Sequence, residues 1–129
     1  MPWVAANPDT RQLYSAVWGD CCNFQIYDLD TFEFAGTLNV PAGLPKEIQG
    51  GAFFEGSLYV TSNLNVSVWK VDVTTGDLEF VLSDDYIDNH IYEMEGLDFW
   101  DLENIGAGTM HMYGNFMKVL EKGVRNFKK

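Results

Sequence analysis

The stretch QGGAFFEGSLYVTSNLNVSVWKVDVTTG, residues 49–76, decides the fold. Runs of β-branched and aromatic residues alternate in it with the turn pairs Glu55-Gly56 and Thr75-Gly76. Runs of five or six such residues between tight turns are typical of antiparallel hairpins. We therefore expect strands in and just after this stretch, at 58–62, 66–71 and 78–82.

The first third of the chain repeats the same pattern of short strand-like runs separated by turn residues. The segment 23–28 alternates polar and apolar residues, which is the period of a half-buried strand. Similar runs cover 13–18 and 33–38, and Asn7-Pro8-Asp9 provides turn chemistry before them. The sequence therefore predicts an all-β chain. Only the last segment, 116–129, is ambiguous between a short helix and one more pair of strands.

The runs recur with a regular spacing. The segments that begin at Trp3, Gln49 and Glu95 align, and their positions 3, 49 and 95 differ by 46 in both steps. Tyr14 and Tyr59 then fall at equivalent places in the second strand of each unit. A repeat of this length is typical of a four-stranded antiparallel meander, the size of one β-propeller blade. We predict three such units, at about 1–46, 47–92 and 93–129.

The motifs in these units resemble those of a known family. The third strand ends on an aspartate followed by a turn, which we align as Asp30 in the first unit and Asp72 in the second. Together with Gln49-Gly-Gly-Ala52 and Glu93-Met-Glu-Gly96, this pattern resembles six-bladed propellers of the calcium-dependent lactonase and phosphotriesterase-like type. The resemblance implies propeller blades and a binding site at the mouth of a central channel. It also implies secreted-type relatives.

The length sets the number of blades. At about 46 residues per blade, 129 residues provide about 2.8 blades, whereas closed propellers have about four to eight. An open stack of about three blades would leave two apolar blade faces in water, which is unfavourable. We therefore expect a partial propeller, in which the chain is one part of a ring. Either blades are missing from a longer chain, or two copies form a closed six-bladed homodimer. In the dimer, residues 117–127 would supply outer strands of the third blade.

Candidate site residues gather at the start of each first strand and at the loop after each second strand. In a propeller these places open on one face, where loops held by a rigid scaffold carry function. The expected ligand-binding residues are Trp3, Asp20, Gln49, Asn63, His90, Glu93 and Glu95. Carboxylate and amide oxygens suit Ca²⁺, and the resemblance points to Glu95, Asn63 and Asn115 as its ligands. The simpler interpretation is that Glu95 caps a strand or binds backbone amides.

Histidines and tryptophans add weaker candidates. His90 lies in an acidic loop, where a solvated side chain is the simpler interpretation than a catalytic base. His111 lies between two methionines in a predicted strand, which favours packing. We expect Trp18, Trp69 and Trp100 to fill the space between blades, with stacking on a ligand as the alternative.

The two cysteines, Cys21 and Cys22, are adjacent, so they cannot join distant parts of the fold. We expect two reduced thiols, because a bond between neighbours requires a tight eight-membered ring; such a bond is the alternative. The cysteines do not fix a compartment. The start, Met1 to Val4, has no basic region or cleavage site typical of a secretory signal, and we expect sequence to be missing before it. Localisation stays unassigned.

The net charge and the motifs limit the classes of function that the sequence supports. The net charge of −11 disfavours binding to nucleic acid or to anionic membrane surfaces, since both need Lys or Arg against phosphates. No catalytic motif of a nucleophilic hydrolase, P-loop or zinc site is present. The first hypothesis is a binding module with its site at the channel mouth. The alternatives are a metal-dependent hydrolase of the lactonase type, using Ca²⁺, and a structural subunit of a larger assembly.

Overall fold

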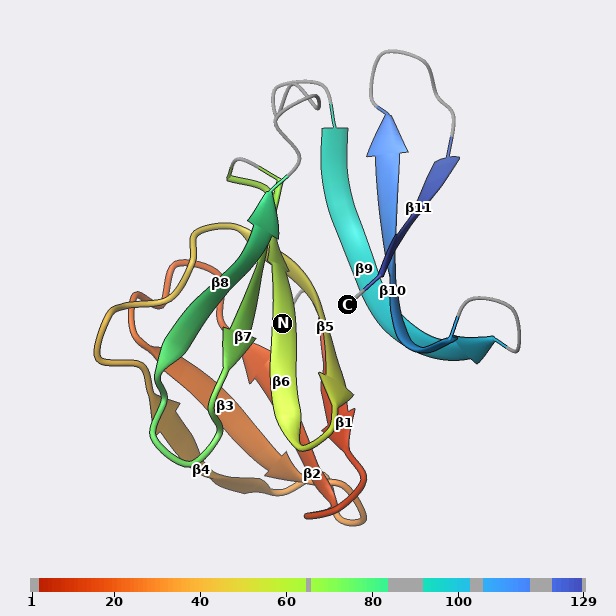
Figure 1. Ribbon diagram of the computed structural model, residues 1–129. Helices are drawn as coiled ribbons and strands as arrows, with labels where there is room; N and C mark the ends of the chain where they lie inside the picture. The colour runs from red at the N-terminus through yellow and green to blue at the C-terminus, as the bar shows by residue number, and fades with distance from the viewer. Residues whose placement is uncertain (1–2, 65, 84–91, 103–105, 117–121, 129) are drawn as a thin grey trace.

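Three antiparallel sheets follow one another along the chain (Figure 1). The computed structural model describes the backbone of residues 3–64, 66–83, 92–102, 106–116 and 122–128, and the side chains of 3–64, 66–83 and 96–99. The described residues contain strands and no helix, which confirms the all-β prediction. Each strand pairs with its neighbours in sequence, so every sheet is a simple meander.

The first two sheets have four strands each. The first has the order β1-β2-β3-β4, with β1 (Ala5–Asn7), β2 (Gln12–Ala16), β3 (Asn23–Asp28) and β4 (Phe34–Asn39). The second has the order β5-β6-β7-β8, with β5 (Ile48–Phe54), β6 (Ser57–Ser62), β7 (Ser67–Val71) and β8 (Leu78–Ser83). Glu55 and Gly56 both have positive φ, 47° and 77°. They form the two-residue turn that joins β5 to β6.

The third sheet has three strands among the described residues, in the order β11-β10-β9. They are β9 (Tyr92–Leu102), β10 (Gly106–Phe116) and β11 (Lys122–Lys128). Two of them are eleven residues long, which is longer than the sequence predicts. The ambiguous segment after 116 therefore supplies one strand, β11, which pairs along β10 from Thr109 to Asn115.

The second strands of the first two sheets are equivalent, as predicted. Leu13 pairs with Tyr27, the residue before Asp28, and Leu58 pairs with Val71, the residue before Asp72. Each is followed along its strand by a tyrosine, Tyr14 or Tyr59. The alignment of Asp30 with Asp72 is therefore wrong, because the strand-ending aspartate of the first sheet is Asp28.

A β-bulge explains why the alignment of the first strands, β1 and β5, is also shifted by one residue. Ala5 pairs with Tyr14, and Ala52 pairs with Tyr59, so Ala5 is equivalent to Ala52. The 46-residue spacing would align Ala5 with Gly51 instead. The register shift between Ile48 and Gly50 inserts one extra residue into β5 and moves the alignment by one position.

The two aspartates perform the same local task. The Asp72 carboxylate accepts backbone N–H bonds from Thr74 (2.7 Å) and Thr75 (3.1 Å). The backbone amides of Thr31 and Asp30 donate to Asp28 in the same way, each at 2.8 Å. These bonds favour the charged form, and they lower the pKa of both carboxyls from the ordinary value of 3.8. Each aspartate thereby closes the turn that leads into the fourth strand.

The sheets pack face to face through a repeated aromatic contact. Tyr14 of the first sheet meets Phe53 of the second edge-on, with ring centroids 5.2 Å apart. Tyr59 of the second sheet meets Phe99 of the third in the same manner, at 4.8 Å. The partners Phe53 and Phe99 are 46 residues apart. The core between the first two sheets contains Trp3, Phe24, Val40, Leu58, Val60 and Val71.

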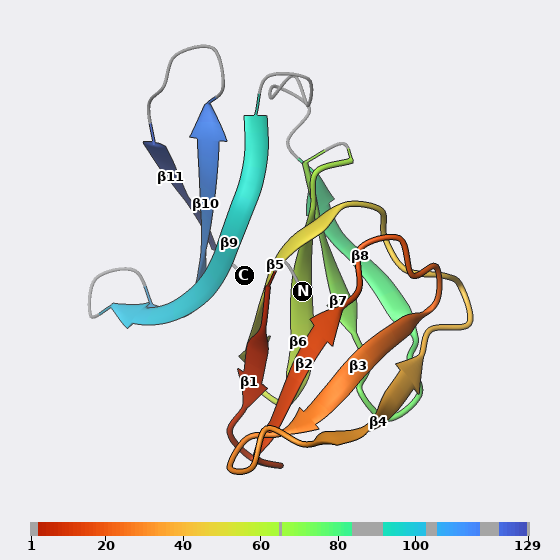
Figure 2. The same cartoon turned by 180° about the vertical axis from the view of Figure 1, so that it is seen from behind.

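The first strands of the three sheets lie next to one another, with β5 in contact with both β1 and β9 (Figures 1 and 2). Glycines permit this approach. A Cβ on Gly51 would lie 2.8 Å from the ring of Trp3, and a Cβ on Gly50 would lie 2.9 Å from the Cα of Gly96. The lack of a side chain at Gly50 and Gly51 of β5 therefore permits the sheets to converge this closely.

Candidate ligand pocket

A cavity of about 520 Å³ lies beside the end of β2 and the start of β5. Two segments line it, namely the β2–β3 loop and the chain that connects β4 to β5. This is the end of the sheets at which the sequence places the channel mouth. The lining residues are Ala16, Val17, Trp18, Gly19, Asp20, Cys21, Leu44, Pro45, Lys46, Glu47 and Ile48.

The β2–β3 loop is shaped by Asp20. Its Oδ1 accepts hydrogen bonds from the backbone amides of Cys22 (2.9 Å) and Asn23 (3.1 Å). Its own amide donates to the Val17 carbonyl at 2.9 Å, which closes a turn through Gly19 at φ +89°. Asp20 lines the pocket, and one of its carboxylate oxygens already has a structural role.

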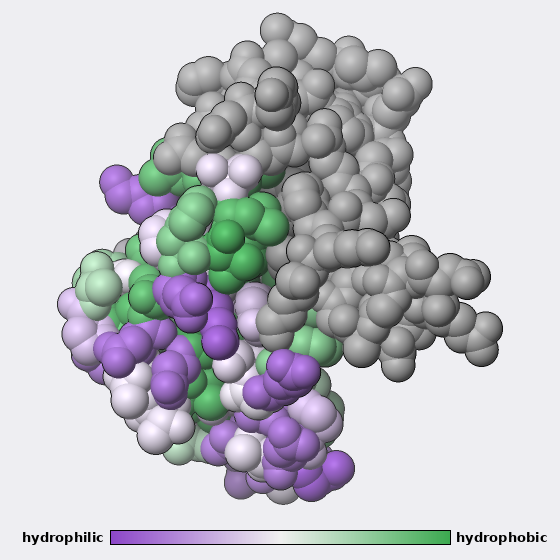
Figure 3. Space-filling view, in the orientation of Figure 1, coloured by the Kyte–Doolittle hydropathy of each residue, from purple (hydrophilic) through white to green (hydrophobic). Residues whose placement is uncertain are grey.

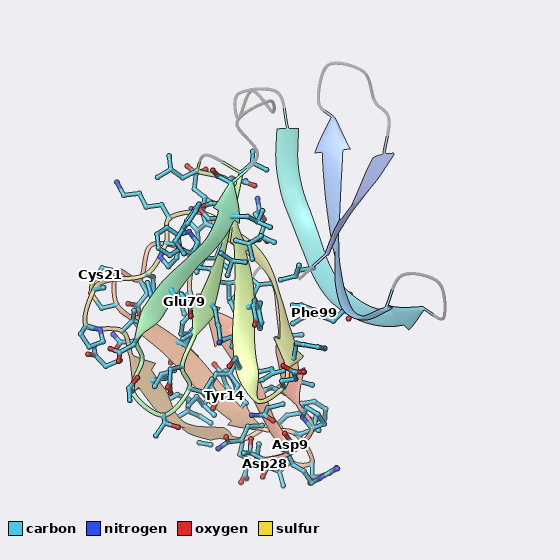
Figure 4. The ribbon with its side chains drawn as sticks, in the orientation of Figure 1. Asp9, Tyr14, Cys21, Asp28, Glu79 and Phe99 are labelled. Atoms are coloured by element: carbon cyan, nitrogen blue, oxygen red, sulfur yellow. A yellow bond between two sulfur atoms is a disulfide. The ribbon has the colours of Figure 1, made fainter. Side chains whose placement is uncertain are left out.

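Cys21 and Cys22 form a disulfide with each other, so the expectation of two reduced thiols is wrong. The bonds of Asp20 to the adjacent amides bend the dipeptide, and the carbonyls of both cysteines are held from outside. The surrounding hydrogen bonds thus support a geometry that an isolated dipeptide rarely adopts. Cys21 is exposed and Cys22 is half-buried. Figure 4 shows Cys21 on the side of the molecule opposite the third sheet.

The second wall is hydrogen-bonded to the first. The amide of Leu44 donates to the Cys21 carbonyl at 2.6 Å, and the amide of Val40 donates to the Cys22 carbonyl at 2.7 Å. Gly43, at φ +84°, makes the turn between these two donors. The β4–β5 connection therefore follows the disulfide-bearing loop closely, and the two walls are positioned as one unit.

The far side of the connection is fixed by the end of β6. The Ser62 hydroxyl donates to the Lys46 carbonyl at 2.5 Å, and the Asn63 amide donates to the Glu47 carbonyl at 3.1 Å. Glu47 has φ +56°, a backbone conformation that non-glycine residues seldom adopt. Strained residues held by their surroundings are common at binding sites. The end of the second sheet thus holds Lys46 and Glu47 at the pocket.

Trp18 has an exposed fraction of 61%, and the adjacent Val17 has 48%. The expectation that Trp18 fills the space between sheets is therefore wrong. It lies just past the end of β2, in the turn that Gly19 completes, and this turn carries it beyond the packed part of the sheet. Trp69, in contrast, packs against the core between the first two sheets, as expected. The side chain of Trp100 lies outside the described side chains.

The remaining predicted residues are distributed between the pocket and the core. Asn63 is buried and touches the pocket wall through its backbone. Gln49 follows the lining residue Ile48 and is half-buried. Trp3 is only 8% exposed and packs edge-on against Phe24, so its side chain belongs to the core between the sheets. Its buried indole N–H has no hydrogen-bond partner within the described part of the chain.

The acidic candidates of the third sheet are placed by their backbone. Glu93 pairs with Asn115 across β9 and β10, and the register shifts between this pair and the Gly96–Tyr113 pair. Glu95 lies in that irregular stretch of β9. His111 pairs with Asp98. The candidate His90 lies outside the described residues. Among the residues that the structure describes, no group of three or more His, Cys, Asp or Glu side chains is placed to hold a metal ion.

Sequence reasoning missed half of the pocket. It identified the loop from Gly19 to Asn23 as part of the mouth but overlooked the connection from Leu44 to Glu47. The signal for this wall is Gly43-Leu44-Pro45, a turn sequence directly before the first strand of the second unit.

No family model matches this chain, and no curated protein shows significant similarity to it. Within the described residues, no helix is long and apolar enough to cross a membrane.

Proposed function

We propose that this protein is a binding module of the β-propeller type that holds a small ligand in the pocket between the β2–β3 loop and the β4–β5 connection. The observation that carries the proposal is the 520 Å³ cavity with the exposed Trp18 on its lining. Small-molecule sites have this range of volume and combine apolar walls with a few polar groups. Here Trp18, Val17 and Leu44 supply the apolar area, and Lys46 and Glu47 supply charge.

The repeated packing supports the blade interpretation. The Tyr14–Phe53 and Tyr59–Phe99 contacts join successive sheets in the same way, and the first strand of the second sheet lies between the first strands of its neighbours. Successive blades of a propeller pack with this repetition around a shared axis. The convergence at Gly50 is in keeping with first strands that line a narrow channel.

The uncovered face of the first sheet supports association. Leu58 and Val71 are fully buried against the first sheet. Their equivalents in the first sheet, Leu13 and Tyr27, face away from the second sheet and are only half-buried. In the orientation of Figure 1, the space-filling view shows apolar residues gathered over the strand ends of the second sheet (Figure 3). We propose that the third sheet of a second copy covers Leu13 and Tyr27, which gives a closed six-bladed dimer.

Light scattering tests the dimer. Copies associated through this face have a mass of twice 14.6 kDa at micromolar concentration. The variant Tyr27→Lys places a charge at the centre of the interface and shifts the mass toward 14.6 kDa, whereas the exposed turn variant Asp9→Lys leaves it unchanged. A wild-type monomer with a cooperative melt would refute the closed ring and leave the pocket proposal standing.

A fragment screen tests the pocket. The probe is a library of fluorinated aromatic and cyclohexyl compounds observed by ¹⁹F NMR. The ¹⁹F signal of at least one fragment is expected to broaden in the presence of the wild-type protein and to stay sharp in the presence of Trp18→Ala. The matched control is Phe32→Ala, since Phe32 is an equally exposed aromatic residue (69%) at the other end of the first sheet. If no fragment distinguishes Trp18→Ala from the control, the pocket is not a binding site.

The calcium-dependent hydrolase stays a prediction, because the side chains of Glu95 and Asn115 lie outside the described side chains. The structural subunit likewise stays a prediction. The pocket supports binding more directly than either, since its walls, their hydrogen bonds and its exposed aromatic residue are all described.

A further inference from the structure

We infer that the Cys21–Cys22 disulfide is a redox site that controls the shape of the pocket, and this inference rests on the proposed ligand site. Cys21 lines the cavity and is exposed, while Cys22 is half-buried behind it. A disulfide between neighbours adds no link between distant parts of the chain. Its effect is confined to the conformation of the loop that carries it, which is one wall of the pocket.

The backbone of this dipeptide is the connection between the two walls. The Cys21 carbonyl accepts the Leu44 amide, the Cys22 carbonyl accepts the Val40 amide, and the Cys22 amide donates to Asp20. The eight-membered ring limits the rotations that orient these groups. Opening the ring restores backbone freedom to the dipeptide, and the conformational entropy then opposes both carbonyl bonds. Reduction is therefore expected to loosen the β4–β5 connection at Val40 and Leu44.

The chemistry is thiol–disulfide exchange with a dithiol reductant. A thiolate of the reductant attacks the exposed Cys21 sulfur, the Cys21–Cys22 bond breaks, and Cys22 leaves as a thiolate that takes up a proton. The second thiolate of the reductant then attacks the mixed disulfide and releases Cys21, which is protonated in turn. Two electrons pass to the protein, and the reductant leaves as its own disulfide. Exposure of Cys21 makes the first step accessible.

Hydrogen exchange measures the coupling without a ligand. The oxidised protein and the protein reduced with dithiothreitol are compared by NMR, and mass spectrometry confirms the gain of two hydrogens. The amides of Val40 and Leu44 are expected to exchange about tenfold faster after reduction, which corresponds to about 1.4 kcal/mol. The Phe32 amide, which donates to the Asp28 carbonyl at 2.9 Å in the turn at the other end of the first sheet, is the internal control and stays unchanged.

The double variant Cys21→Ser, Cys22→Ser serves as a second test. It is expected to show the fast exchange of the reduced protein and no response to dithiothreitol. If this variant does not fold, the reduced wild type alone decides the result. The inference is overturned if the air-oxidised protein retains two free thiols, or if full reduction leaves Val40 and Leu44 unchanged.

Ligand binding separates this inference from the proposed function. A fragment that depends on Trp18 should bind about tenfold more weakly to the reduced protein. If such a fragment binds equally to both forms, redox control of the pocket is wrong although the binding site stands. If no fragment depends on Trp18, the proposed function fails, and exchange at Val40 and Leu44 still decides whether the disulfide controls the two walls.

Discussion

Alanine at Gly76 is expected to destabilise the protein far more than alanine at Gly56, although the two glycines have nearly the same backbone conformation. Their φ angles are +79° and +77°. The left-handed conformation costs an alanine about 1–2 kcal/mol, and the lower entropy of the unfolded chain returns about 0.4–1 kcal/mol. Gly56 has no atom within 4 Å of an added Cβ. Gly56→Ala should therefore lower the free energy of unfolding by only about 1 kcal/mol.

Gly76 carries an additional steric cost. Its Cβ would lie 1.9 Å from the Asn39 carbonyl oxygen and 3.4 Å from the ring of Pro41. The β7–β8 turn must then move by at least about 1 Å from the chain that leaves β4, and overpacking of this kind costs about 1–3 kcal/mol. The expected total for Gly76→Ala is about 2–4 kcal/mol.

Urea unfolding followed by tryptophan fluorescence measures both variants, at one protein concentration so that association is held constant. Equal slopes and a lower midpoint for Gly76→Ala are expected. A difference between the two variants below about 0.5 kcal/mol would mean that the β7–β8 turn does not press on Asn39. The chain after Asn39 becomes the second wall of the pocket, so Gly76→Ala should also weaken binding of a Trp18-dependent fragment.

Three further outcomes follow from the packing and the turns. Gly50→Ala should lower the free energy of unfolding by about 1–3 kcal/mol in the same assay, because its Cβ meets the Gly96 backbone; a neutral effect would place β9 further away. Phe32→Gly should stabilise the protein by about 0.5 kcal/mol in urea, because Phe32 is exposed at φ +59°, and a loss of stability would show that the ring makes useful contacts. The pKa of Asp72 is lowered in the folded protein, so its contribution to the free energy of unfolding is complete above pH 3.8 and is lost as the pH falls through the lower folded value. Asp72→Asn should therefore flatten the decline of the melting temperature in acid. An unchanged decline would contradict this.

Much of the fold is encoded locally. The alternation in 23–28 and the apolar runs at 58–62 and 78–82 predict strands that the structure contains within a residue or two at each end. Glu55-Gly56 marks its hairpin, because Gly56 readily adopts the positive φ that a two-residue turn needs at both positions. These features depend on near neighbours in the chain, so the sequence reveals them directly.

The alignment of the repeats is only partly encoded. The 46-residue spacing correctly pairs Phe53 with Phe99, and both rings receive the tyrosine of the preceding sheet. The bulge near Gly50 shifts the first strands by one residue, and no spacing argument detects it. Strand register is decided by pairing across the sheet, which depends on residues that are distant in sequence.

The pocket required the tertiary structure. The sequence places Asp20 and the cysteine pair in one loop, but it favours free thiols there and a buried Trp18. The disulfide is supported by amides of Val40 and Leu44, about twenty residues further along the chain, and the pocket exists because these amides reach the two cysteine carbonyls. Local propensity determined which residues form strands and turns. Contacts between segments far apart in the sequence determined which side chains became core and which became the walls of a cavity, since burial is a property of the packed molecule.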